Sequence, residues 1–133
     1  MATTIEVPKV RTLLTERHHA VITTRGEDGA MHSAVVWVDV QDGQVAVNSA
    51  VGRTWPTNME RDPQVTVLVM NEAYPYEYVE IRGTASGTTE GADDHIDRLA
   101  KKYLDADSYP FRQEGEQRIT YRVTPTLVRY QKQ

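Results

Sequence analysis

Residues 48–63 read NSAVGRTWPTNMERDP, a polar and aromatic connector between two apolar, β-branched segments. Gly52 tolerates backbone conformations that end a strand, and Pro56 lacks the N–H that a strand or the middle of a helix would use. Proline is common in the first turn of a helix, where that N–H has no partner anyway. The stretch therefore predicts a strand end, a turn and a short helix from about Trp55 to Arg61.

The start of this helix has the chemistry of an anion site. Arg53 and Thr54 come immediately before it, at the end where the helix dipole and the unpaired N–H groups favour negative charge. A guanidinium adds a donor fork that matches phosphate or carboxylate oxygens. The alternative is an ordinary surface turn in which Arg53 is solvated, and the connector alone favours neither interpretation.

Around the connector, short β-branched segments alternate with turn sequences. The turns GEDG at 26–29 and QDG at 41–43 are typical of hairpins. Segment 64–70 is apolar or β-branched nearly throughout, which predicts a strand covered on both faces. The expected strands are 19–25, 31–40, 44–50, 64–70, 78–88 and 118–130.

Two further segments have helical periodicity. Val7 to Glu16 has a proline in its first turn, and Ala92 to Leu104 has an apolar stripe with acids near its start and lysines near its end. Six strands and two or three helices, joined mostly as hairpins, predict an α+β, mainly β fold around an antiparallel barrel. The length predicts a single domain, residues 1–133.

Composition excludes several classes of protein. The chain has 133 residues, a formal net charge of −4 and no cysteine. Without cysteine there are no disulfides, thiolate nucleophiles or cysteine metal sites. No basic stripe indicates nucleic acid. No segment approaches the roughly 20 apolar residues that span a bilayer, and the N-terminus lacks a signal-like apolar run. We expect a cytoplasmic protein with neither a nucleic-acid nor a membrane partner.

The familiar catalytic motifs are missing from the sequence, which has no GxGxxG, P-loop, GxSxG or HExxH. His18 and His19 would alternate across a strand, so we expect no metal site there or elsewhere. Asp93, Asp94 and Asp97 share a helix, where the dipole and solvation explain them. No catalytic residue is predicted, so the chemistry is expected to come from a bound cofactor.

The order and spacing of the segments resemble one known family. GRTWPTNMERDPQVTVLV, followed by YVEIRGTA, is similar to the pyridoxamine-phosphate-oxidase-like flavin and deazaflavin oxidoreductases. EGADDHIDRLAKKYLDADSYPFR resembles the branch that uses the deazaflavin coenzyme F-420. The resemblance covers about residues 7–130. It implies a homodimer of six-stranded split β-barrels, with two cofactor sites across the dimer interface.

The resemblance also implies which residues hold the cofactor. Arg53 and Thr54 would contact its phosphate, and Asn58 would brace the loop. Many family members read GR-x-K-x-x-N, and Trp55 stands where their lysine is, so one cation is lost. The indole would either cover the cofactor ring or pack in the core. Further residues expected along the cofactor are Asn48, Ser49 and Ala50, and those expected against its ring are Ser33, Ala34, Val35 and Val36.

The function that the resemblance implies is hydride transfer between reduced F-420 and a small unsaturated organic substrate. One alternative is an oxidase or reductase that uses flavin mononucleotide (FMN). Another is a non-enzymatic carrier or sensor of a flavin or a heme degradation product on the same barrel. The proton donor would be water or one of Tyr76, Tyr78 and Tyr109. Further cations for the anionic tail of F-420 are sought among Lys9, Arg11, Arg17, Arg25 and Arg112.

Overall fold

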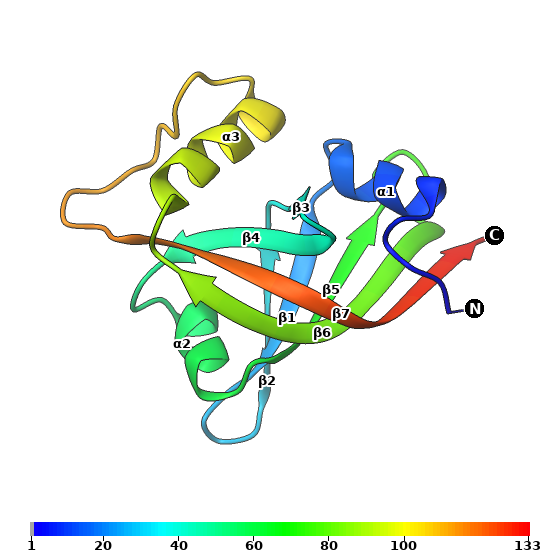
Figure 1. The fold of residues 1–133 in the computed structure, drawn as a ribbon, viewed down its shortest axis with the longest axis horizontal. Coiled ribbons are helices and arrows are strands. Elements are labelled where there is room, and N and C mark those ends of the chain that lie inside the picture. Colours follow the sequence, from blue (N-terminus) through cyan, green and yellow to red (C-terminus); the bar gives the residue numbers. More distant parts are fainter. Residues whose placement is uncertain (1) are drawn as a thin grey trace.

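The computed structural model describes residues 2–133, in which three helices pack on one seven-stranded antiparallel sheet (Figure 1). The strand order is β2-β1-β5-β6-β7-β4-β3. No helix in this range is both long and apolar enough to cross a membrane. The strands are β1 Ala20–Arg25, β2 Met31–Val36, β3 Asp39–Gln41, β4 Gln44–Ala50, β5 Gln64–Met70, β6 Glu77–Thr88 and β7 Arg118–Lys132. The helices are α1 Pro8–Thr15, α2 Thr54–Arg61 and α3 Ala92–Leu104.

The α+β class and the hairpin order are confirmed, but the prediction of six strands is wrong. The expected strand at 31–40 is two strands, because the chain leaves one sheet edge at Val36 and joins the other at Asp39. Between them Trp37 stacks on Tyr103, with ring centroids 5.3 Å apart. The N–H of Val38 donates to the Tyr103 hydroxyl at 3.1 Å instead of to a neighbouring strand.

This break determines the shape of the sheet. β2 and β3 are its two edge strands, and only two residues of chain separate them. Because the three residue steps from Val36 to Asp39 span at most about 11 Å, the sheet must curl until its edges approach. The curled sheet is the barrel, and the break between β2 and β3 is where it is split. Figure 1 shows α2 and α3 at one end of it and α1 with both termini at the other.

The core lies inside the curled sheet. Val10, Leu13 and Leu14 of α1 are buried there, as the helical spacing predicted. Along β5 burial alternates: the valines at 65, 67 and 69 are buried, whereas residues 66, 68 and 70 are only half-buried. Within one chain only the face bearing these valines is buried, so a single chain does not provide the predicted cover on both faces.

The longest ladder joins β6 to β7, and its register shifts once, between Arg82 and Gly83. Gly83 lies opposite Pro125, which has no N–H to donate, so an irregularity there costs the ladder little. The two backbones approach closely at this point. A Cβ built on Gly83 would lie 2.3 Å from the carbonyl oxygen of Thr124 and 2.7 Å from Val123.

Gly83→Ala should therefore lower the free energy of unfolding by about 1–3 kcal/mol, because the added methyl group overpacks against backbone that cannot rotate away. Denaturant unfolding followed by circular dichroism measures the change. Ser86→Ala, at an exposed position of the same strand, is the control and should stay within about 0.5 kcal/mol. Equal midpoints for Gly83→Ala and the parent would contradict the close approach.

Candidate functional site

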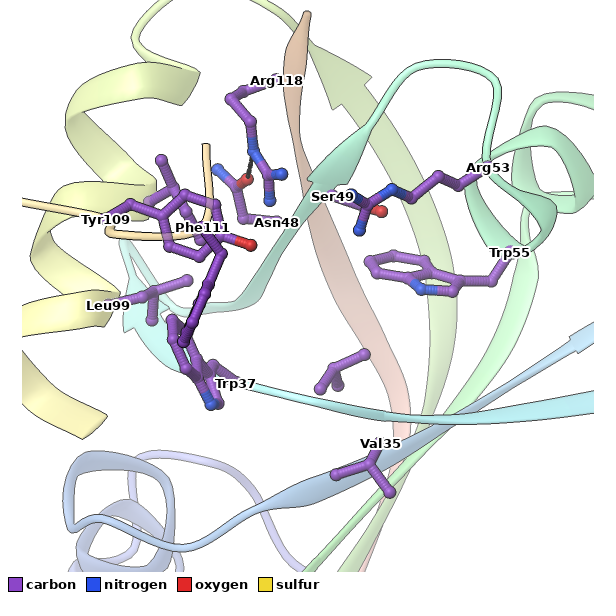
Figure 2. A pocket seen from close by; sticks show the side chains of 12 residues that line it. Val35, Trp37, Asn48, Ser49, Arg53, Trp55, Leu99, Tyr109, Phe111 and Arg118 are labelled. Carbon is purple, nitrogen blue, oxygen red and sulfur yellow. Dashed lines mark hydrogen bonds between the residues drawn. The ribbon is translucent and has the colours of Figure 1, made fainter. Parts of the chain in front are cut away.

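A cavity of about 180 Å³ opens where α2, α3 and the ends of β2 and β4 meet (Figure 2). Figure 2 shows Trp37, Tyr109 and Phe111 on one side of it and Trp55 on the other. The lining residues are Val35, Val36, Trp37, Asn48, Ser49, Arg53, Trp55, Ile96, Leu99, Tyr109, Phe111 and Arg118.

The connector at 51–54 forms one end of the cavity. Gly52 has φ +95°, a left-handed conformation that glycine adopts readily, and it turns the chain out of β4. Arg53 is the N-cap of α2 and has extended backbone, and no side chain caps the helix. The first N–H groups of a helix have no acceptor within it. Thr54 and Trp55 are the first two residues of α2 and directly follow Arg53, so their N–H groups lie at the end of the helix where the sequence predicted an anion site.

Trp55 belongs to both the core and the cavity. Its residue is 9% exposed, and its ring centroid lies 6.4 Å from that of Tyr121. It also lines the cavity. The two roles proposed for Trp55 from sequence, packing and covering, are therefore compatible, and the family's lysine position is occupied by an apolar wall.

Asn48 connects the cavity to a buried polar network. Its side-chain N–H donates to the Ala92 carbonyl at 2.9 Å and lies 3.2 Å from His95 Nδ1. His95 is 1% exposed, and its Nε2 lies 3.2 Å from an Asp39 oxygen. The Asp39 carboxylate accepts, so Nε2 carries the proton and Nδ1 accepts in turn. These contacts fix the amide of Asn48, so that its oxygen faces Arg118 at 2.9 Å.

Arg118, the first residue of β7, is the cation that sequence reasoning missed. It alternates with apolar residues in RITYRV, which predicts a solvated face. Instead the face bearing Arg118 and Thr120 is covered by α3, and these residues are 4% and 2% exposed. No pattern in the strand itself reveals this, because the covering helix lies elsewhere in the sequence.

The loop at 105–117 is held over the cavity by acidic side chains of α3. Asp97 accepts from the Tyr109 backbone N–H at 2.9 Å and from Arg112 at 2.8 Å. Asp93 accepts from the same arginine at 2.7 Å. These aspartates do more than complement the helix dipole: they fix the loop so that Tyr109 packs edge-on against Trp37, with ring centroids 6.1 Å apart.

Tyr103 and Lys102 lie near the aromatic wall, and their side chains bond backbone carbonyls of the barrel and of α1. Burial raises the pKa of Tyr103 to about 12, and its hydroxyl donates to the His18 carbonyl at 2.7 Å. Burial also lowers the pKa of Lys102 to about 8. The Lys102 amine donates to the Leu14 and Val38 carbonyls at 2.8 and 2.5 Å. Both side chains therefore tie α3 to the barrel rather than face the cavity.

The structure brings together only part of the predicted site. Ser33 bonds Thr23 across the β1–β2 ladder at 2.9 Å. Asn58 donates to Thr24 at 3.1 Å, so it braces α2 against β1 rather than the loop. The predicted residues that line the cavity are Val35, Val36, Asn48, Ser49, Arg53 and Trp55, and those that do not are Ser33, Ala34, Ala50, Thr54 and Asn58.

Of the residues considered as proton donors or as cations for the F-420 tail, few lie at the cavity. Tyr109 lines the cavity, and Tyr76 and Tyr78 do not. None of the candidate tail-binding cations Lys9, Arg11, Arg17, Arg25 and Arg112 lines it.

Among residues 2–133 no three histidine, aspartate or glutamate side chains are grouped to hold a metal ion. His18 and His19 instead pair with Glu16 and Glu72, at 3.0 and 2.5 Å.

Comparison with models of protein families identifies the family of this chain. The model of the pyridoxamine 5'-phosphate oxidase family matches residues 7–132. The chain belongs to this family. Its architecture is the split barrel of the family's flavin-binding oxidoreductases. A comparison with curated protein sequences found no significant match.

Solved structures share this fold at low sequence identity. An F420 reductase is 20% identical, covers 90% of this chain and 94% of its own, and has a TM-score of 0.78. A conserved hypothetical protein from Mycobacterium tuberculosis is 18% identical over 95% and 84%, with a TM-score of 0.75. General stress protein 26 from Bacillus anthracis is 20% identical over 96% and 95%, with a TM-score of 0.71. At these identities the likeness shows the fold alone.

Proposed function

We propose that this family member binds coenzyme F-420 in the cavity and transfers a hydride between the reduced coenzyme and a small unsaturated organic substrate. The observation that carries the proposal is the position of Arg53. Its side chain is 48% exposed at the start of α2, beside a cavity walled by aromatic rings. A planar ring with an anionic tail fits such a site, because rings stack on aromatic walls and the tail meets the guanidinium.

The donor set supports a ring joined to a phosphate. Arg53 and the free N–H groups of Thr54 and Trp55 would hold the phosphate. The polar side chains of Asn48 and Ser49, which line the floor of the cavity, would lie along the ribityl chain. When bound, the coenzyme supplies the hydride. The residues of the chain orient the ring and exclude water, which raises the effective concentration of correctly placed reactants.

Two considerations favour F-420 over FMN. Trp55 leaves the phosphate end with fewer cations than the family pattern GR-x-K-x-x-N supplies, and this suits the singly charged phosphodiester of F-420 better than the phosphate monoester of FMN. An F420 reductase is also among the solved structures with this fold. FMN stays the alternative, because one fold can carry different cofactors and chemistries.

We also propose that the chain acts as a homodimer. The cavity, at about 180 Å³, is smaller than the roughly 300–1,000 Å³ of typical ligand pockets, so a second chain would complete it. Met31 and Val35 of the edge strand β2 are 60% and 70% exposed. The half-buried outer face of β5 belongs to the same sheet. A second chain on these surfaces would remove apolar area from water.

The cofactor assignment is tested by adding F-420 or FMN to the purified protein and measuring each equilibrium dissociation constant by fluorescence. Tighter binding of F-420 is expected. Reduced F-420 should then be reoxidised faster with the protein than without it when a panel of α,β-unsaturated carbonyl compounds is supplied. A preference for FMN would transfer the proposal to the alternative cofactor.

Arg53→Ala should weaken F-420 binding about tenfold to a hundredfold, because a charge-assisted hydrogen bond contributes about 1.5–3 kcal/mol. The matched control is Arg129→Ala. Arg129 is exposed on β7 and does not line the cavity, so its loss should leave affinity unchanged. If the Arg53→Ala protein binds as tightly as the parent, the connector does not hold the phosphate.

Sedimentation velocity over a dilution series around micromolar concentration should show a dimer, because the exposed apolar surface of β2 and β5 favours association. A dimer that dissociates only well below micromolar concentration would still agree with this prediction. A monomer throughout the series would contradict the proposed assembly.

A further inference from the structure

A carboxylate lies between the two arginines at the cavity. Arg53 Nη2 donates to one oxygen of Glu116 at 3.2 Å, and Arg118 Nη1 donates to the other at 2.8 Å. The Arg118 and Glu116 side chains are 3% and 5% exposed, whereas that of Arg53 is 48% exposed. Figure 2 shows the two arginines reaching toward Asn48 and Ser49 from different elements. The three charged groups together carry one net positive charge.

Arg118 is held firmly and keeps a donor free. Its Nε donates to Asn48 at 2.9 Å, and its guanidinium lies 4.9 Å from the centre of the Tyr109 ring. Within residues 2–133 no acceptor is bonded to its Nη2. Because Arg118 lines the cavity, this nearly buried side chain presents an unpaired N–H group to whatever anion Arg53 binds.

The net charge of such a site discriminates between anions. The cost of removing an ion from water grows with the square of its charge, whereas its attraction to a fixed charge grows only linearly. A site with one net positive charge therefore suits a singly charged group. A doubly charged group would need another cation, and the family's lysine position holds Trp55.

We propose that Arg53, Arg118 and Glu116 form a phosphate-binding site that selects a singly charged phosphodiester over a doubly charged phosphate monoester. This rests on the proposed function for the occupant, a flavin-like ring with a ribityl phosphate. The two candidate cofactors differ at this position: F-420 carries a phosphodiester, and FMN a monoester with a charge of about −1.5 to −2 at pH 7. Glu116 is then the residue that determines specificity, since it cancels one of the two arginines.

The test uses two ligands with the same ring and ribityl chain: FMN and its phosphate monomethyl ester, a diester that differs by one methyl group and by the lost second phosphate charge. Equilibrium fluorescence titration gives the ratio of their dissociation constants. The parent should bind the ester more tightly. Glu116→Gln, which adds one net positive charge with little change of shape, should shift the ratio toward FMN by about tenfold.

Glu114→Gln is the matched control, since Glu114 is exposed on the same loop and away from the cavity. It removes the same charge from the chain and should leave the ratio unchanged. Thermal denaturation of both variants checks that they fold. An unchanged ratio in folded Glu116→Gln, an equal shift in Glu114→Gln, or no binding of either ligand would overturn the proposal.

A second measurement needs no variant. The second phosphate pKa of FMN is about 6, so at pH 5 FMN is mostly a monoanion like its ester. The preference for the ester should be clear at pH 8 and disappear at pH 5. At pH 5 the two ligands carry nearly the same charge, so the charge of the site no longer distinguishes them. A preference for the ester that does not change with pH would overturn the proposal. Because this measurement uses the parent protein, it tests the proposal even if Glu116→Gln does not fold.

The outcomes also separate this proposal from the proposed function. If the ester preference and its loss in Glu116→Gln are observed but reduced F-420 transfers no hydride, charge selection stands and the proposed activity fails. If hydride transfer is observed and the ratio does not respond to Glu116→Gln, the activity stands and the role of Glu116 fails.

Discussion

Only Trp37 and Val38 separate the two edge strands of the sheet, and the rest of the structure depends on this constraint. Two residues cannot cross an open seven-stranded sheet, so the sheet curls and its edges approach. The same step brings Trp37 to the aromatic wall beneath α3. The cavity therefore lies at the split of the barrel, where strand pairing ends and side chains and helices take over.

At that point the chain buries polar side chains that bond one another. A hydrogen-bonded path runs from Asp39 through His95 and Asn48 to Arg118. It continues through Glu116 to Arg53, whose side chain reaches solvent. Leaving any buried member unpaired would cost a large desolvation penalty, so the members hold one another in place. Donors fixed in advance bind a ligand without first being ordered.

The charge at this site is not the one that the connector pattern alone would give. Trp55 replaces a cation at the first turn of α2, and Arg118 brings one from β7 that the connector does not encode. Glu116 then neutralises one guanidinium, so the number of arginines alone does not describe the site. Under the proposed selection by charge, a loop residue would set binding selectivity, with the core of the barrel left intact.

The sequence by itself determined the helices, the hairpins, the family and the position of Arg53 at the start of α2, because these depend on local periodicity, turn residues and motif order. It predicted Arg53 and Asn48 at the cavity, since both belong to the connector region. Only the tertiary structure divided the strand at 31–40, buried Arg118 under α3 and placed Glu116 between two arginines. Each of these depends on contacts between segments far apart in the chain, and the pattern of a strand does not show which of its polar residues a distant helix will cover.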